Sequence, residues 1–528
     1  MRVRAGVLIA LALTSATAQA ATRYVSPHGA GSGPCTHAAP CSVAFAVNGD
    51  GSSSGDHVVV GAGTYVDQPV LITRPLTLTA PADRPRPVFR TTADDGVALT
   101  VGSGAAGTVV EHLTVRATGS GSVGIDVQDT AALDDLTVSS VDGACLRSAA
   151  GGLRLADTSF TQSGVAGDPC LQSTGPDASW TSISVSALNG DTAASFISDG
   201  MITDATFEAS TVGLRLGDDP IVHRVTAIGG EVGIDLGGSS RVTDSVAIAR
   251  DGGSAVFAAG GTHTLLNVTA WGEGSGSFGV RATTGAAIEV ENSIARGHAK
   301  DLAADPATTT VTADCAQVTG CPAASMSANH SNFRTASPSV IDGGKNGFGA
   351  PRFADPAFED FHLRRGSAAI DRGNFDFNSG SADRDGLYRW LGRAPDIGAY
   401  EYVPPAKPAR AAHDTTAPRL TGVSLTTNRF RVPGHGVALA ASTPAGTTLR
   451  FTLSESADLV VLIRRPGADT PVVGALVRAY APGSHGMKIS GRVDDRVLRP
   501  GPYTMTVIGR DEAQNLSRSR KLGFTVVS

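Results

Sequence analysis

Nine short strand-forming segments recur along the middle of this 528-residue chain at a nearly constant interval. Each is a triplet, and successive triplets begin 20 to 25 residues apart. The triplets begin at Leu113, Leu136, Thr158, Ile183, Ala205, Val225, Val246, Val268 and Ser293. A repeat of this length is typical of a solenoid with one turn of chain per repeat. In most triplets the outer residues are apolar and the middle residue is Ser or Thr, so two side chains point inward and one points to solvent.

A polar residue stands immediately before every triplet, where short polar side chains favour a turn. These residues are His112, Asp135, Asp157, Ser182, Asp204, Arg224, Ser245, Asn267 and Asn292. A second strand per repeat follows Gly124, Gly213, Gly233 and Gly279. With two or three short strands per repeat and little helical patterning, the sequence predicts a parallel β-helix. Leucine-rich repeats have a similar period, but their leucine and asparagine signature is missing.

The first twenty residues have the features of a secretory signal peptide. Arg2 and Arg4 precede an apolar run from Gly6 to Leu13, and Ala18-Gln19-Ala20 is a small-residue cleavage site. No later stretch approaches the ~20 apolar residues that a membrane helix needs, so we expect no membrane span. The formal net charge is only −6, and there is no basic patch with aromatic residues, so we expect no nucleic-acid partner. The sequence predicts a protein that is secreted or held at the cell surface.

Six cysteines are read as disulfides, because secreted proteins meet oxidising surroundings. Cys145 and Cys170 occupy matching tetrapeptides one repeat apart. Stacked coils lie about 4.8 Å apart, within the ~4.4–6.8 Å Cα separation that a disulfide accepts. A metal site is the alternative, which the absence of CxxC spacing and nearby histidines disfavours. The predicted pairs are Cys35–Cys41, Cys145–Cys170 and Cys315–Cys321.

The start of the mature chain resembles the entry segment of bacterial secreted β-helix proteins. Tyr24-Val25-Ser26-Pro27, the first two cysteines and a short helical stretch from Val43 to Asn48 carry the likeness. In that family the small helix closes the open end of the first coil. A cap is also required physically, because a solenoid end otherwise exposes core residues and unpaired strand edges.

A later segment resembles the closing motif of secreted β-helix proteins often called choice-of-anchor Q. The likeness rests on Phe361-His362-Leu363, Gly366 to Gly373, Asp383-Arg384-Asp385-Gly386 and Arg393 to Glu401. The resemblance implies the pectate-lyase-like superfamily and a right-handed coil, in agreement with the bias of parallel crossovers. It implies a scaffold and does not fix an activity.

Composition changes again near the C-terminus. A stiff linker rich in Pro and Ala precedes about 110 residues with alternating strands and Gly/Pro turns, which predict a small β-sandwich similar to immunoglobulin-like modules. The predicted fold is therefore all-β, a right-handed parallel β-helix followed by a small β-sandwich. The predicted segments are the signal peptide (1–20), N-terminal cap and first coils (21–105), parallel β-helix with closing motif (106–403), linker (404–418) and immunoglobulin-like β-sandwich (419–528).

Catalytic motifs of β-helix enzymes are mostly missing. Polygalacturonase-like enzymes combine an Asn-Thr-Asp, paired aspartates, a Gly-His-Gly and an Arg-Ile-Lys. This chain has paired aspartates at 134–135 and 218–219, but its one Gly434-His435-Gly436 lies in the C-terminal module. The catalytic residues are therefore unknown.

Asp135 and Asp157 are the candidate acidic pair, because they occupy equivalent positions on neighbouring coils about 5 Å apart. Such a pair can bind Ca²⁺ or raise one carboxyl pKa, but turn capping is the favoured interpretation. The Asp383–Gly386 loop is likewise favoured as a structural turn. Apart from this possible Ca²⁺, we expect no metal or cofactor.

Candidate ligand-facing residues lie on the other strand of the repeat. Arg215, Asp235 and Arg281 belong to a charged stripe, although a surface ion pair between Arg215 and Asp235 of little energetic value is favoured. Trp271 offers an aromatic face for a sugar, but the repeats contain too few tryptophans for an aromatic platform.

The function predicted from these features is that of a monomeric extracellular protein that binds polysaccharide or a cell-surface glycan through its lateral face. The alternative is a polysaccharide lyase, glycoside hydrolase or epimerase acting on uronate-containing glycans, with a site assembled from separated coils. A surface for ice or crystals along the threonine column is disfavoured, because Ala247 and Ile294 interrupt the column.

Overall fold

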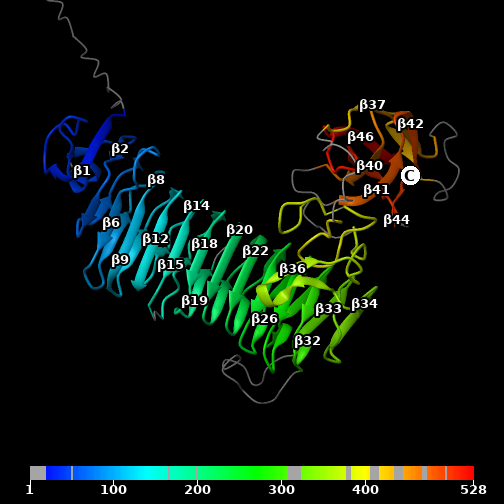
Figure 1. Ribbon diagram of the computed structural model, residues 1–528, viewed down its shortest axis with the longest axis horizontal. Helices are drawn as coiled ribbons and strands as arrows, with labels where there is room; N and C mark the ends of the chain where they lie inside the picture. Colours follow the sequence, from blue (N-terminus) through cyan, green and yellow to red (C-terminus); the bar gives the residue numbers. More distant parts are fainter. Residues whose placement is uncertain are drawn as a thin grey trace, which may run out of the picture. The chain divides into compact units, whose positions relative to one another are not determined.

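The computed structural model describes residues 20–48, 51–164, 167–197, 199–306, 323–375, 382–389, 391–404, 416–432, 444–466, 472–493 and 496–527. The chain divides into two compact units, Met1–Ser179 and Trp180–Ser528. Short strands dominate both of them (Figure 1).

The first unit is a stack of short parallel strands that follow a single small helix. Its elements are β1 (Thr22–Ala30), α1 (Val43–Val47), β2 (His57–Val60), β3 (Thr64–Val66), β4 (Val70–Ile72), β5 (Thr77–Thr79), β6 (Val88–Thr91), β7 (Val97–Val101), β8 (Thr108–Glu111), β9 (Thr114–Ser120), β10 (Val123–Val127), β11 (Ala131–Asp134), β12 (Thr137–Asp142), β13 (Leu146–Ser148), β14 (Arg154–Ala156), β15 (Ser159–Gln162) and β16 (Leu171–Ser173). Ser42 caps α1 by accepting a hydrogen bond from the Phe45 amide. The buried face of α1 lies against β1 and β4, as expected for a helix that closes the first coil.

Register in the first unit confirms a parallel β-solenoid. Each strand pairs in parallel with the strand one coil later, so that β6, β9, β12 and β15 form one ladder and β4, β7, β10, β13 and β16 form another. Val115, Val138 and Phe160 are fully or almost fully buried between the ladders. Apolar residues alternate with polar ones because successive strand side chains point to opposite faces.

Two of the predicted disulfides are present. Cys35 pairs with Cys41, and Cys145 pairs with Cys170 across one coil at a Cα separation of 4.7 Å. The register that places Leu146 opposite Leu171 makes the second bond possible. The predicted Cys315–Cys321 bond and the signal peptide up to residue 19 lie outside the described residues.

The predicted turn column is confirmed with one correction. Eight of the nine residues adopt a positive φ, the left-handed conformation that short polar residues tolerate best: His112, Asp135, Asp157, Ser182, Asp204, Arg224, Asn267 and Asn292. Ser245 was the wrong residue for its coil, because Thr226 pairs with Val246 and therefore places Asp244, with a φ of 53°, in the turn. The triplet that begins at Val246 is consequently shifted by one, and Ala247 points inward.

The second unit continues with the same kind of parallel coil. Its first elements are β17 (Ala178–Thr181), β18 (Ser184–Ala187), β19 (Thr192–Phe196), β20 (Gly200–Ala209), β21 (Val212–Leu216), β22 (Pro220–Gly229), β23 (Val232–Leu236), β24 (Ser240–Thr243), β25 (Val246–Ala249), β26 (Ser254–Ala259), β27 (Thr262–Leu266), β28 (Thr269–Gly272), β29 (Phe278–Thr283), β30 (Ala287–Glu291), β31 (Ile294–Arg296), β32 (Lys300–Ala304), β33 (Ser325–Asn329) and β34 (Val340–Gly344). The ladder β22, β25, β28 and β31 is parallel and in register.

A segment after the last coil folds back along the outside of this ladder. This closing segment, residues 353–402, includes β35 (Phe353–Asp355), a 3-10 turn (Pro356–Phe358) and β36 (Asp360–Leu363). Phe361, Ile397 and Ala399 of the closing segment share one apolar cluster with Val246 and Ile248 on the outer face of β25. The closing segment therefore covers part of the outer face of its own unit.

The remaining described residues of the second unit form two main sheets and a two-stranded sheet. Their strands are β37 (Leu420–Leu425), β38 (Arg429–Arg431), β39 (Thr447–Leu453), β40 (Ala457–Arg464), β41 (Val472–Tyr480), β42 (Gly483–Ile489), β43 (Arg492–Val493), β44 (Arg496–Val497), β45 (Gly501–Arg510) and β46 (Arg520–Val527). The main sheets have the orders β37-β39-β42 and β38-β46-β45-β40-β41, and the two-stranded sheet is β43-β44. Leu449 and Phe451 of the first share a core with Val461 and Met505 of the second. Within the described residues, no helix is long and apolar enough to cross a membrane.

Candidate functional site

The outer face of the first unit carries two columns of side chains on β3, β6, β9, β12 and β15. The first column is Val66, Arg90, Arg116, Ser139 and Thr161, and the second is Thr64, Val88, Thr114, Thr137 and Ser159. We name these ten residues the free lateral face. Neighbouring rungs of a β-ladder lie about 4.8 Å apart, so each column presents one side chain at that interval.

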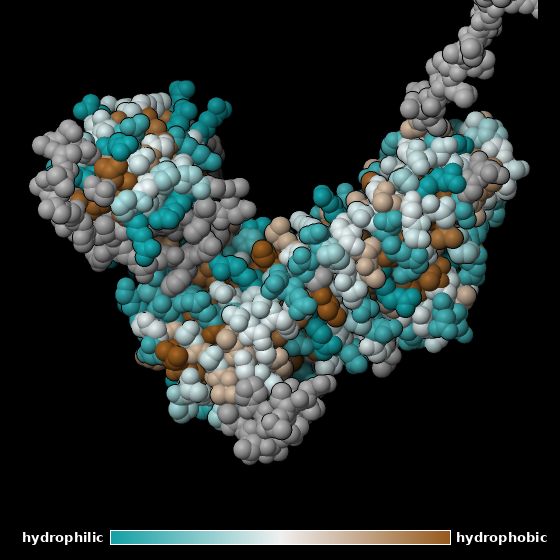
Figure 2. Space-filling model, turned by 180° about the vertical axis from the view of Figure 1, so that it is seen from behind, coloured by the Kyte–Doolittle hydropathy of each residue, from teal (hydrophilic) through white to brown (hydrophobic). Residues whose placement is uncertain are grey.

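Most of these side chains meet solvent. Arg90, Arg116, Thr137 and Thr161 are exposed, and Ser139 is half-buried. Hydroxyl and guanidinium groups dominate because the outward positions of these strands are polar while the alternate positions are apolar. The side of the molecule that is turned away in Figure 1 is drawn in Figure 2, and hydrophobic residues there form small separate groups among hydrophilic ones. The free lateral face is therefore suited to hydrogen bonding with a polar ligand.

Three arginines and one histidine near this face differ in what they contact. Arg86 donates to the backbone oxygen of Asp135 at 2.8 Å and forms an ion pair with its carboxylate, and His112 lies 2.6 Å from the same carboxylate. Arg90 and Arg116 occupy adjacent rungs. Within the described part of the chain, neither of their side chains has an ion pair or a hydrogen bond. Two adjacent guanidinium groups on the free lateral face therefore form no ion pair, although Arg90 interacts electrostatically with Asp67.

A hollow of about 290 Å³ adjoins Arg90. Asp67 and Gln68 line it together with Arg90 and the bend that leads to Ala98. Both Asp67 oxygens are already engaged, at 2.7 Å by the Thr92 amide and at 2.6 Å by the Thr92 hydroxyl. These hydrogen bonds, more than the more distant Arg90, lower the pKa of Asp67. The hollow is slightly smaller than the ~300–1,000 Å³ of sites for drug-sized ligands.

The candidate acidic pair is divided between two environments. Hydrogen bonding from His112, with a further contribution from Arg86, lowers the pKa of Asp135. Asp157 is exposed, and its charge helps burial to raise the pKa of Asp134. No group of three or more His, Cys, Asp or Glu side chains in the described ranges is arranged to hold a metal ion. Calcium binding by Asp135 and Asp157 stays a prediction.

The candidate ligand-facing residues all have partners within the protein. Arg215 and Asp235 form an ion pair at 2.9 Å. Arg281 pairs with Asp305 at 2.9 Å and lies over the Phe278 ring. A role for these residues in ligand binding stays a prediction.

Trp271 has less of its ring available for a sugar than the sequence suggested. It contacts Phe353 and Phe361 of the closing segment, and its indole nitrogen donates to Glu273 at 3.1 Å. The sequence could not show this, because the two phenylalanines lie far along the chain.

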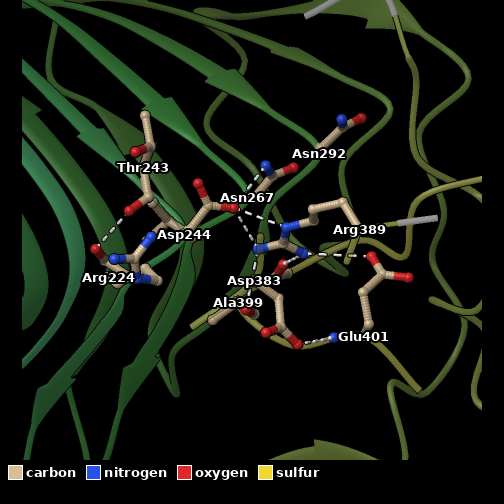
Figure 3. Close-up of polar contacts among 12 residues, drawn as sticks. Arg224, Thr243, Asp244, Asn267, Asn292, Asp383, Arg389, Ala399 and Glu401 are labelled. Carbon is tan, nitrogen blue, oxygen red and sulfur yellow. Dashed lines mark hydrogen bonds and ion pairs between the residues drawn. The ribbon is translucent and has the colours of Figure 1, made fainter. Parts of the chain in front are cut away.

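A buried charged cluster joins the closing segment to the turn column of the second unit (Figure 3). The Arg389 Nη2 atom lies 2.6 Å from the Asp244 carboxylate, and both side chains are fully buried. Arg389 also donates to the backbone oxygens of Gly398 and Ala399 at 2.8 and 2.9 Å. The guanidinium is thereby satisfied, and the cluster has a structural role.

The acids of the charged cluster titrate differently. Burial alone would raise the pKa of Asp244, but the neighbouring Arg389 and His223 hold it below its usual value. Burial and the nearby Asp396 raise the pKa of Glu401 well above its usual value, and burial raises the pKa of Asp396 to about 6. Burial therefore favours the neutral form of Glu401, whereas Arg389 and His223 favour the charged form of Asp244.

Comparisons with known proteins give little information on function. No protein-family model matches the chain, and no curated protein matches it. Among solved structures, the crystal structure of pectate lyase Pel9A is similar at 15% sequence identity and a TM-score of 0.39, covering 72% of this chain and 96% of that one. The parallel β-solenoid rests on the strand registers and not on this similarity.

Proposed function

We propose that this protein is an extracellular polysaccharide-binding β-helix protein and that the free lateral face of its first unit is the binding surface. The observation that carries the proposal is the presence on that face of two columns in register, in which Arg90, Arg116, Thr137 and Thr161 are exposed and polar, although Val66 and Val88 are apolar and Thr114 is buried. A polysaccharide also presents hydroxyl groups at regular intervals, so a ladder of Thr, Ser and Arg side chains offers it repeated donors and acceptors.

The charge distribution supports binding rather than catalysis on this face. A catalytic acid or base needs a titratable side chain within reach of substrate. Near this face, Asp135 and His112 are bound to each other and to Arg86, and Asp67 accepts hydrogen bonds from Thr92. The lyase, hydrolase or epimerase alternative is therefore the second candidate.

Several finer features belong to the same proposal. We propose that the chain is secreted through its first twenty residues, that the coil is right-handed and that residues 361–401 carry a choice-of-anchor Q closing motif. Residues 419–528 are proposed to be an immunoglobulin-like β-sandwich, an interpretation supported by the two sheets with one shared core. Two disulfides are consistent with an extracellular location.

The test is glycan binding by the full chain, first on an array and then in solution with the oligosaccharides that bind. Replacing Thr137, Ser139 and Thr161 together by Ala is expected to weaken binding about tenfold or more, because several hydrogen bonds are lost. The matched control replaces Arg147 and Gln172, which point outward from β13 and β16 on the other ladder, and is expected to change nothing.

Two results would contradict the proposal. One is unchanged binding by the triple variant, which would place the ligand elsewhere. The other is the appearance of new reducing ends or unsaturated uronates in the glycans that bind, which would show catalysis.

A further inference from the structure

Arg90 and Arg116 are the unusual feature of the free lateral face. The parallel register places them directly opposite each other on β6 and β9. Both are exposed, and within the described residues neither side chain has a hydrogen bond or an ion pair. Like charges on adjacent rungs repel each other, so this arrangement is unfavourable unless an anion is bound.

Among the described residues, no carboxylate forms an ion pair with either arginine. Asp67 interacts electrostatically with Arg90 without an ion pair, and its two oxygens accept hydrogen bonds from the Thr92 amide and hydroxyl. Asp135, the other nearby acid, is occupied by Arg86 and His112. The two guanidinium groups are thus the charged groups on this face that remain available to a ligand.

We propose that Arg90 and Arg116 together bind one anionic group of a polysaccharide, a carboxylate or a sulfate ester. Guanidinium groups suit this role, because they present several donors in one plane to an oxyanion. The proposal rests on the proposed function, since it concerns the same face, and it assigns the class of glycan to that face.

The rest of the face defines how such a ligand would lie. Beyond Arg116 the same column continues with Ser139 and Thr161, which offer hydroxyl groups to the next sugars. Before Arg90 the hollow lined by Gln68 gives room for a sugar at the other end. A polysaccharide that crosses the strands therefore meets the hollow, the two arginines and the hydroxyl groups in that order.

The experiment measures affinities of the full chain for three matched hexasaccharides, namely an oligogalacturonate, a sulfated oligosaccharide and neutral cellohexaose. We expect the wild type to prefer at least one anionic probe, with an affinity that falls as salt is added. The R90Q/R116Q variant is expected to lose about tenfold or more of that affinity, with no change for the neutral probe. The carboxylate and sulfate probes distinguish the two sources of negative charge.

The control is R154Q, which removes an exposed arginine from β14 on a different outer face of the same unit. It is expected to leave all three affinities unchanged, and circular dichroism should show that each variant folds. Equal affinity of the wild type for anionic and neutral probes, or an R90Q/R116Q variant with undiminished anionic binding, would overturn this inference alone. Failure of every glycan to bind the wild type would overturn the proposed function as well.

Discussion

Equivalent strands of the coil differ in the character of their outer faces, which is polar and exposed in the first unit and apolar and buried in the second. On β12 and β15 of the first unit, the outward residues are Thr, Ser, Ser and Thr, and they meet solvent. On β25 of the second unit the outward residues are Val246 and Ile248, each 1% exposed beneath the closing segment. The composition of the outward positions therefore encodes whether a coil keeps a free surface or receives another part of the chain.

The two faces also differ in the contacts that stabilise them. The free lateral face needs no contact with distant sequence. The covered face combines an apolar cluster with the Arg389–Asp244 ion pair, which joins residues 145 positions apart. Hydrophobic burial supplies most of the stabilisation of such a contact, and the buried ion pair fixes its register.

Removing Arg389 is expected to have the largest effect. Arg389→Met leaves the Asp244 carboxylate buried without its cation, which costs about 3–5 kcal/mol. Denaturant unfolding followed by hydrogen exchange should show the loss in the coils and closing segment of the second unit, with the first unit unchanged. The paired variant R389M/D244N should recover much of the loss, because no charge is then left unpaired. Equal destabilisation by the single and paired variants would contradict this role for the ion pair.

The contrast between the faces can be tested at one outward position in each unit. Ile248→Ala removes a buried side chain under the closing segment and is expected to cost about 2–4 kcal/mol. Thr137→Ala removes an exposed hydroxyl from the free lateral face and should change stability by less than about 0.5 kcal/mol. Unfolding midpoints in the same denaturant measure both. Similar costs at the two positions would mean that the outer faces are not distinguished in this way.

Much of the solenoid could be predicted because its signals are local. The repeat, the turn column and the Cys145–Cys170 bond depend on residues one coil apart. Ser245 was assigned to a turn because either Asp244 or Ser245 suits one, and only the register decides between them. Val246 and Ile248 were then read as core residues, since an apolar outward residue looks the same in sequence as an inward one.

The sequence indicates the candidate site less clearly than it indicates the fold. Arg90 lies 26 residues before Arg116, and the irregular first coils conceal their common position. The repeated pattern of Phe89-Arg90 and Val115-Arg116 is the one signal that would have aligned them. Arg389 could not be found at all, because its partner is fixed by three-dimensional packing and not by spacing.

Acid–base behaviour gives the last contrast between the units. In the second unit, burial with help from Glu289 raises the pKa of Glu291 to about 8. A carboxyl whose folded pKa exceeds its unfolded value of about 4.5 binds its proton more tightly when folded, so stability falls as pH rises from about 4.5 to 8. Glu291→Gln cannot lose a proton, so its stability relative to wild type should rise by up to about 1.4 kcal/mol per pH unit in this window.

Asp135 in the first unit has the opposite sign. His112 and Arg86 lower its pKa, so the stability it contributes is present above its unfolded pKa of about 3.9 and is lost as pH falls below that value. Because its side chain is 43% exposed, Asp135→Asn should cost less than about 1 kcal/mol at pH 7 and nothing at pH 2. Thermal unfolding of E291Q, D135N and the wild type between pH 2 and 9 tests both predictions. Parallel pH profiles for E291Q and D135N would refute the contrast, because a buried proton in one unit and an exposed ion pair in the other must respond in opposite directions.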